Sequence, residues 1–212
     1  MASRPLKAVS EGGDSALGAR LRQERDRVGL SLRELARRLE VSPSLVSQIE
    51  TGKTQPSVRT LYAIVSELGV SLDDVFSREN GGVRTSRGRG KRRAGGDAVQ
   101  RAHDRSVIDL GSGVHWERLT TWNDRDVDFL YAIYEPGGAS SPDESLVRHN
   151  GREFGIVVSG SLGVTVGFDE YVLEPGDSIS FDSSVPHRLH NDSDEVVNAI
   201  WVVLGRHHAP EQ

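Results

Sequence analysis

The spacing of apolar residues divides the chain into two parts with different periods. From about residue 16 to residue 76, short apolar clusters recur at the intervals of helices, and beyond about residue 106 apolar and polar positions alternate as they do in strands. Between them, residues 79–105 are rich in Gly and Arg and carry almost no apolar residue. Such a stretch cannot bury enough surface to fold alone, so the pattern predicts two domains joined by a linker.

Five short helices are predicted in the first part. The first, in ALGARLRQERDRVG, stops at Gly29, which suits a left-handed cap. The second opens at Ser31, which forms a capping box with Glu34, and the third opens at Ser42, with Pro43 at a position where its missing N–H costs nothing. The fourth and fifth are expected in SVRTLYAIVSEL and SLDDVFS.

Six segments of the second part have the composition and alternation of strands. They are separated by Gly, Pro, Asn and Asp, which favour turns. Many short strands at close spacing indicate a β-sandwich or barrel. The segments are DFLYAIYEP, FGIVVSG, LGVTVG, YVLEPGDSISF, HRLHN and VVNAIWVVL.

These patterns predict a two-domain fold, α followed by all-β. We expect a disordered tail at residues 1–15, a helical domain at 16–78, the basic linker at 79–105 and the strand-rich domain at 106–208.

Charge is distributed unevenly along the chain. The net charge is -5, with 8 basic and 2 acidic residues in 81–105 but 6 basic and 18 acidic residues in 106–212. The acidic part would repel nucleic acid, so any DNA contact is expected before it. The run RGRGKRR is either a solvated linker or a source of salt-dependent affinity for the duplex.

Composition excludes several kinds of site. Without cysteine there are no disulfides, thiolate zinc sites or cysteine nucleophiles, so a metal would need His, carboxylate or water ligands. The N-terminus lacks the apolar segment of a signal peptide, and no run of about 18 apolar residues could span a bilayer. We therefore expect a cytoplasmic protein without a membrane partner.

Two of the predicted helices, joined across EVSPS, have the spacing of a helix-turn-helix unit. The stretch LSLRELARRLEVSPSLVSQIETGKTQPSVRTLYAIVSELGVSLDDVF resembles the lambda-repressor-like, or XRE, family, because LA, S-x-I-E-x-G and P-S-x-x-T-L fall at the family's intervals. The resemblance implies a five-helix fold, a double-stranded DNA operator and a recognition helix at residues 43–50.

The resemblance also assigns roles to residues on and around that helix. Its groove-facing residues would be Ser44, Ser47 and Gln48, of which Gln48 is the best base reader because its amide matches the N7 and N6 edge of adenine. The flanking residues would meet phosphates: Ser42, Lys53 and Thr54. A buried pair, Arg25 and Glu50, would tie the first helix to the third. Many members carry longer polar side chains at the positions of Pro43 and Ser44, so direct base readout would be sparse here.

Two later stretches, HNGREFGIVVSGSLGV and LEPGDSISFDSSVPHRLHN, resemble the two motifs of the cupin superfamily, whose members are small jelly-roll barrels. The first histidine of the family's H-x-H is replaced by Val147. The residues in register are His149, Glu153 and Gly160 in the first motif, and Gly176, His187 and Asn191 in the second.

If His149, Glu153 and His187 converge, they form a two-histidine, one-carboxylate site suited to a divalent Fe, Mn, Ni or Zn. A tight turn at Asn150 and Gly151 would send Glu153 to the opposite face, so a metal site requires a longer, bulged turn. The alternative is that these side chains hydrogen-bond an organic ligand. Further pocket residues are expected to be Val147, Tyr131, Phe154 and Trp201.

The domain order resembles that of regulators that join an XRE domain to a cupin sensor. Non-heme iron enzymes of the hydroxypropylphosphonate epoxidase type share this order and the ligand set, and Arg148, Arg152 and Arg188 keep that alternative open. The polar recognition helix and the basic linker favour the regulator. We therefore predict a non-enzymatic regulator that binds DNA and responds to a small-molecule effector, with repression favoured over activation. It is expected to form a homodimer or a higher homo-oligomer.

Overall fold

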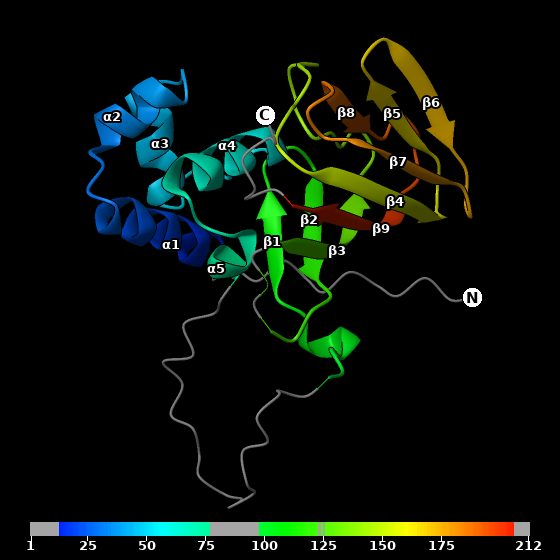
Figure 1. Ribbon diagram of the computed structural model, residues 1–212, viewed down its shortest axis with the longest axis horizontal. Helices are drawn as coiled ribbons and strands as arrows, with labels where there is room; N and C mark the ends of the chain where they lie inside the picture. The colour runs from blue at the N-terminus through cyan, green and yellow to red at the C-terminus, as the bar shows by residue number, and fades with distance from the viewer. Residues whose placement is uncertain (1–12, 77–97, 123, 125, 206–212) are drawn as a thin grey trace, which may run out of the picture.

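The computed structural model describes residues 13–76, 98–122, 124 and 126–205. Its α-helices lie together on one side and its strands on the other, with α4 and α5 between (Figure 1). Among the described residues there are five α-helices and one short 3₁₀ helix: α1 (Gly13–Arg27), α2 (Leu32–Arg38), α3 (Pro43–Glu50), α4 (Val58–Leu68), α5 (Leu72–Phe76) and η1 (Ala102–Asp104). No helix in this part of the chain is long and apolar enough to cross a membrane.

The helices begin and end at residues whose side chains or backbone favour a boundary. The hydroxyl oxygens of Ser31, Ser42 and Ser57 accept hydrogen bonds from backbone N–H groups three residues later, so each caps its helix. Gly69 ends α4 in the left-handed region at φ 65°. The predicted order of five helices is confirmed, although α1 begins at Gly13, inside the segment predicted as a tail.

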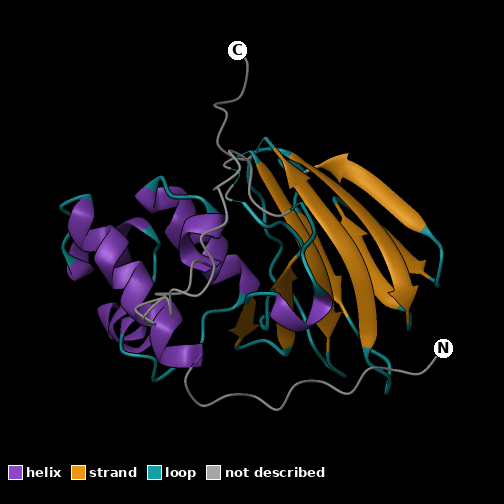
Figure 2. Cartoon of the chain, turned by 90° about the horizontal axis from the view of Figure 1, so that it is seen from below, coloured by secondary structure: helices purple, strands orange, loops and turns teal. Residues whose placement is uncertain are grey.

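Nine strands follow in the described part: β1 (Val107–Leu110), β2 (Val114–Arg118), β3 (Val127–Tyr134), β4 (Arg152–Ser159), β5 (Leu162–Val166), β6 (Asp169–Leu173), β7 (Ser178–Asp182), β8 (His187–His190) and β9 (Val197–Leu204). They form two antiparallel sheets that face each other (Figure 2). The larger has the order β1-β2-β3-β9-β4-β7 and the smaller β6-β5-β8. This arrangement confirms the predicted all-β second domain.

The strand pattern differs from the sequence prediction at two places. Strands β1 and β2 were not among the predicted segments, although Ile108, Leu110, Val114 and Trp116 alternate and are buried. The segment YVLEPGDSISF is divided into β6 and β7, because Gly176 turns the chain at φ 96°.

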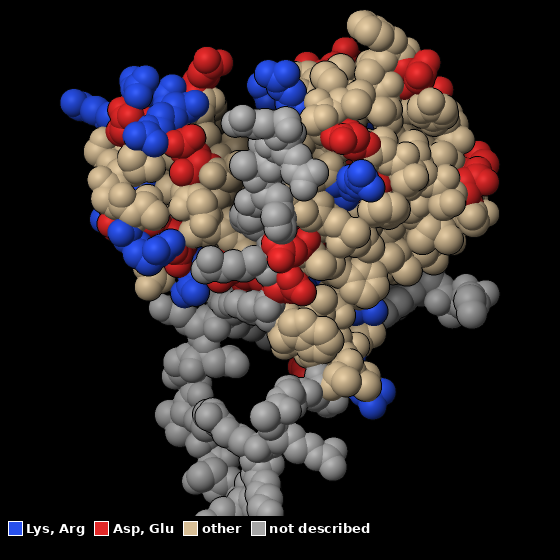
Figure 3. Space-filling view, viewed as in Figure 1, with Lys and Arg blue, Asp and Glu red and all other residues tan. Residues whose placement is uncertain are grey.

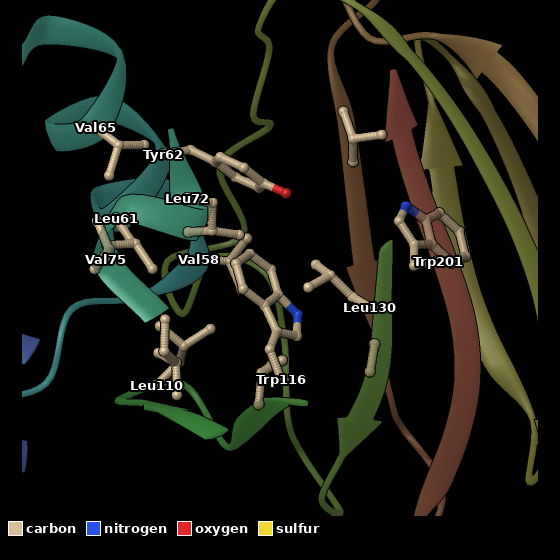
Figure 4. Close-up of a cluster of buried hydrophobic side chains, with 14 of the residues drawn as sticks. Val58, Leu61, Tyr62, Val65, Leu72, Val75, Leu110, Trp116, Leu130 and Trp201 are labelled. Atoms are coloured by element: carbon tan, nitrogen blue, oxygen red, sulfur yellow. The ribbon is translucent and has the colours of Figure 1, made fainter. Parts of the chain in front are cut away.

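The two domains share one continuous hydrophobic core, which runs from Leu17 to Val203. Side chains of α4 face those of β2 and β3 across the boundary (Figure 4). Most of the predicted linker, residues 77–97, lies outside the described residues. The last residue of the predicted linker, Arg105, belongs to the second domain. It forms an ion pair with Glu117 at 2.9 Å and lies over the ring of Tyr131.

Candidate DNA-reading helix and metal centre

The predicted recognition helix, α3, presents polar residues to solvent and apolar residues to the core. Ser44, Ser47 and Gln48 are exposed, whereas Val46 and Ile49 are buried. The helix lies at the end of the molecule away from the strands (Figure 1). The second domain therefore leaves the face that carries Gln48 uncovered.

The residues that flank α3 are also placed at the surface. Lys53 and Thr54 are exposed, and their backbone N–H groups donate to the Gln48 carbonyl at 2.8 and 3.3 Å. Ser42 caps the helix with its side-chain oxygen, and its hydroxyl hydrogen can still donate to another acceptor. Lys and Arg gather with Asp and Glu over the α2 end of the helical domain (Figure 3).

Arg25 and Glu50 tie α1 to α3. The Arg25 guanidinium donates from Nε and Nη2 to the two Glu50 oxygens at 2.6 and 2.9 Å. Both side chains are buried, and the Glu50 hydrogen bond raises the pKa of Arg25 despite its burial. A bidentate pair of this kind holds the recognition helix at one angle to the rest of the domain.

Three side chains from two separate stretches of the sequence meet inside the second domain: His149 and Glu153 from one, and His187 from the other. The Glu153 Oε1 atom lies 3.1 Å from His149 Nε2 and 3.0 Å from His187 Nε2. One ligand atom of each residue lies within 4.8 Å of the others, and this is the one such cluster of His, Asp and Glu found in the described part of the chain. The predicted ligand set is therefore brought together, with Val147 beside it.

The hydrogen bonds around the two histidines leave both Nε2 atoms turned toward the carboxylate. His149 Nδ1 lies 2.9 Å from the Asn150 carbonyl and His187 Nδ1 lies 2.9 Å from the Val185 carbonyl. A carbonyl only accepts, so each Nδ1 carries the proton, and a neutral ring offers its Nε2 lone pair to Glu153. The two Nε2 lone pairs and the anionic Glu153 oxygen repel one another at these distances. A cation or additional protons between them would remove this repulsion.

Trp201 fixes the orientation of the carboxylate. Its Nε1–H donates to Glu153 Oε2 at 2.7 Å, which leaves Oε1 for the histidines. The indole ring lies so close to the backbone of β4 that a Cβ added at Gly155 would come within 1.9 Å of it. A donor that hydrogen-bonds the far oxygen of a carboxylate in this way holds the near oxygen in one orientation toward a metal. The sequence prediction placed Trp201 in the pocket but did not assign it this hydrogen bond.

Electrostatics within the cluster favour a charged carboxylate. Burial opposes ionisation of Glu153, but hydrogen bonds from the two histidines outweigh it and lower the pKa of the carboxyl well below its usual range. Burial also opposes the charging of His187, but the Glu153 carboxylate raises the pKa of this imidazole. Each of these two groups therefore favours the charged form of the other.

Neither of the two predicted turns brings His149 and Glu153 together. Val147 pairs with His187, and the His149 N–H donates to the Ser183 carbonyl at 3.0 Å, whereas β4 pairs with β7 and β9. Residues 147–153 thus pair along one stretch, residues 181–187, and do not form a hairpin with one another. The prediction considered hairpins alone and was wrong in this respect.

The three ligands lie in a small enclosed cavity. Val147 and Trp201 line it as predicted, but Tyr131 and Phe154 do not, because each alternates with an inward-facing neighbour and points to the other face of its strand. Phe154 is 41% exposed. The lining residues are Val58, Tyr62, Trp116, Leu130, Ala132, Tyr134, Ser140, Val147, His149, Glu153, His187, Leu189 and Trp201.

Two of the lining residues, Val58 and Tyr62, come from α4 in the first domain. The Tyr62 ring lies 4.8 Å from the His149 ring, centroid to centroid, and 5.3 Å from the Trp116 ring. The sequence prediction missed both residues. Their spacing is that of any apolar helix face, and nothing in it distinguishes a wall of a neighbouring site from an ordinary core.

Comparison with known protein families decides the nature of both domains. Residues 21–75 match the helix-turn-helix family model, and residues 130–203 match the cupin domain model. This chain joins a helix-turn-helix domain of the XRE type to a cupin domain. The cupin assignment accounts for the enclosed site within the two sheets, and the helix-turn-helix assignment for the exposed face of α3.

Three known proteins are similar to this helix-turn-helix/cupin chain over most of its length. It is 28% identical over 180 residues to the HTH-type transcriptional regulator PuuR of Escherichia coli, a match that spans 84% of this chain and 89% of PuuR. The crystal structure of an HTH_3 family transcriptional regulator from Vibrio cholerae has the same fold, with a TM-score of 0.63, 19% identity and coverage of 91% and 96% of the two chains. The hydroxypropylphosphonic acid epoxidase of S. wedmorenis has a TM-score of 0.44 and 19% identity, over 92% and 100%.

Proposed function

We propose that this DNA-binding regulator senses a small-molecule effector through a metal centre in its cupin domain. The single observation that carries the proposal is the meeting of His149, Glu153 and His187 in a cavity walled partly by the DNA-binding domain. The relationship to a transcriptional regulator along most of both chains supports the DNA-binding role. The protein would act in the cytoplasm, on double-stranded DNA.

Base reading is assigned to Gln48, with Ser44 and Ser47 beside it on α3. The exposed amide of Gln48 can pair with adenine in the major groove, and the short serines allow the helix to approach the bases closely. Phosphate contacts are assigned to Ser42, Lys53 and Thr54. With few direct base contacts, specificity would rest on Gln48, the spacing of two half-sites and DNA shape.

The donor set fits a divalent transition metal. Two imidazole nitrogens and one carboxylate oxygen would hold Fe, Mn, Ni or Zn, and Glu153 Oε1 has no other hydrogen-bond partner apart from the two facing histidines. The metal would supply a Lewis-acidic position for an oxygen atom of an effector. Val147, in place of a further histidine, leaves a three-ligand set.

An iron oxidase or epoxidase is the second candidate, and the ligand triad alone supports it. A phosphonate substrate would require cationic side chains beside the ligands. Among the described residues, however, no Lys or Arg lines the cavity. Arg148 and Arg152 are exposed, and Arg188 alternates on β8 with the inward-facing His187 and Leu189. The lining therefore favours a regulator over a phosphonate enzyme.

We infer that a second copy of the chain covers the outer face of β4. Phe154, Ile156 and Val158 are consecutive outward residues on this interior strand, and they are 41%, 41% and 48% exposed. In a two-fold dimer the same patch of both copies meets itself, and uncharged residues suit such a patch. A dimer also supplies the two recognition helices that read two half-sites. The proposed homodimer thus joins its cupin domains.

The experiment that tests the function is selection of genomic fragments by the full chain, followed by affinity measurements on the selected and shuffled sequences. A specific regulator is expected to bind the selected sequence about a thousandfold or more tightly than the shuffled one. Equal affinity for both sequences would reject sequence-specific regulation.

A further inference from the structure

Helix α4 of the DNA-binding domain forms part of the wall around the cupin's ligand residues. Val58 and Tyr62 are buried, and they face Trp116 and Leu130 of the cupin domain (Figure 4). The Tyr62 ring packs directly on His149 at 4.8 Å. The site therefore consists of residues from both domains, although all three ligands come from the cupin.

With α4 in this position, the cavity is too small for an organic molecule. Its volume is about 20 Å³, which is close to the space of one water molecule. Pockets that bind drug-sized organic ligands have volumes of roughly 300–1,000 Å³. This space is of the order of a single ion or water molecule, so an organic acid would have to displace part of the lining, such as the Tyr62 ring.

We propose that α4 is a movable wall of the cupin site, so that an organic acid enters only when the helical domain leaves the cupin. This inference rests on the metal centre of the proposed function. It adds a way in which ligand binding at the cupin site would change DNA binding. A ligand that binds only the separated form shifts the chain toward separation. The orientation of α3 relative to the cupin would then no longer be fixed.

Beside the apolar packing of α4, its polar contacts with the cupin domain are of a kind that can separate. At one edge the Gly111 N–H donates to the Pro56 carbonyl at 3.0 Å, and at another the Arg59 N–H donates to the Ser140 carbonyl at 3.1 Å. The exposed Arg59 side chain reaches Ser145 Oγ at 2.6 Å. Backbone groups and exposed side chains of this kind can bond to water instead when the domains part.

On the other side of the boundary, α5 contributes one charged contact. Asp73 accepts from Arg118 Nη1 at 3.3 Å and from the Asp124 N–H at 2.6 Å. Burial is the main cause that raises the pKa of Asp73, although the Asp124 N–H and Arg118 oppose it. This contact, like those of Arg59, ends in polar groups that water can replace.

Gly111 offers a way to separate the domains without changing the pocket. A Cβ at this position would lie 2.6 Å from the Gln55 carbonyl oxygen, so an alanine forces the two backbones apart. Gly111 does not line the cavity. The variant Gly111→Ala therefore acts as a wedge, whereas Tyr62→Ala enlarges the cavity directly.

The test uses the full chain loaded with Co(II), whose visible absorption reports its ligands, and oxalate as a probe that offers two oxygen atoms. Oxalate affinity is expected to rise by about tenfold or more in both Gly111→Ala and Tyr62→Ala, because less of the binding free energy is used to move α4. In the wild type, oxalate should increase the radius of gyration measured by X-ray scattering. Gly111→Ala should show a similar increase without oxalate.

The matched control is Tyr171→Ala, which removes a half-exposed tyrosine from β6, outside the cavity, and should bind oxalate as the wild type does. If Gly111→Ala expands the chain yet binds oxalate with wild-type affinity, the movable wall is ruled out. Failure of the wild type to bind Co(II) would instead remove the metal centre, and the inference with it. Neither result depends on DNA, so the outcome is separate from that of the operator experiment.

Discussion

At the scale of single residues, the proposed metal centre depends on groups that orient the ligands as much as on the ligands themselves. Trp201 donates to Glu153 Oε2, and the carbonyls of Asn150 and Val185 accept from the histidine Nδ1 atoms. These contacts leave one oxygen and two nitrogens aimed at one point. A substitution that spares the ligands can therefore still weaken the site.

Trp201→Phe is expected to lower the affinity for Co(II) or Zn(II) by about 10- to 100-fold, because Glu153 Oε2 loses its donor and the carboxylate can turn. Competition titration against a chelator measures the change. Trp122→Phe is the control, since Trp122 is 55% exposed. Equal affinities in the two variants would show that the indole hydrogen bond does not orient the ligand.

The metal-free cluster predicts a stability that depends on pH. The His187 pKa is raised by Glu153, so this pair stabilises the fold fully below the ordinary histidine value and loses its effect as pH rises through the raised value. Thermal unfolding of the metal-free chain should show a higher Tm at pH 6 than at pH 8. The difference should shrink in Glu153→Gln. An unchanged difference would assign the effect to other groups.

Metal binding should have the opposite pH dependence. A metal ligand must be a neutral imidazole, so protons compete with the metal at His149 and His187. The rise in Tm caused by Zn(II) is expected to be larger at pH 8 than at pH 6, as measured by calorimetry. A rise of equal size at both pH values would argue against these histidines as ligands.

Substitutions of Gln48 on α3 and of Lys53 just after it are expected to weaken DNA binding in different ways. Gln48→Ala should cost about 1–3 kcal/mol on the selected operator, with little change on other DNA, because it removes base contacts. Lys53→Ala should weaken binding to all sequences and reduce the salt dependence by about one counterion. Titrations at several salt concentrations separate the two effects. A uniform loss for Gln48→Ala would contradict its role in base reading.

The site residues differ in how far the sequence could predict them. His149, Glu153 and His187 were identified from motif spacing, because that spacing follows the strands that carry them. Tyr131 and Phe154 were placed wrongly, since a period of two sends each to the opposite face from its neighbour in the cavity. With Glu153 inward, Phe154 had to point outward.

At the scale of elements, β4 carries a different chemistry on each face. Its inward face holds Glu153, and its outward face presents Phe154, Ile156 and Val158. Ile156→Glu is expected to convert a dimer into a monomer, because it places a charge in the proposed interface. Sedimentation velocity measures the change, with Val172→Glu on β6 as the control. A wild-type oligomeric state in Ile156→Glu would remove this face from the interface.

The helices were predicted more completely than the strands. Serine caps, Pro43 and the terminating glycines are local signals, and each helix boundary depends on contacts within a few residues. Strands β1 and β2 are short and pair through a turn at Gly113, whose φ is 70°. Their boundaries depend on pairing with β3, a tertiary contact that the local pattern did not reveal.

At the scale of the whole molecule, the sequence did not predict that the domains pack into one core. Val58 and Tyr62 have the spacing of an ordinary apolar helix face, and the basic linker suggested independent domains. Because of this packing, α4 of the DNA-binding domain forms part of the wall of the cupin site. This shared wall is the physical basis of the proposed regulation, since it offers a direct contact between the ligand residues and α4.

We propose that the position of the helical domain on the cupin controls binding to DNA. The most direct measurement is the Kd of the selected operator for the wild-type chain and for Gly111→Ala, in which no ligand, pocket or α3 residue is changed. We expect the variant to bind at least about fivefold more weakly, because separation frees α3 from a fixed orientation. The same Kd for a variant that scattering shows to be expanded would contradict the account.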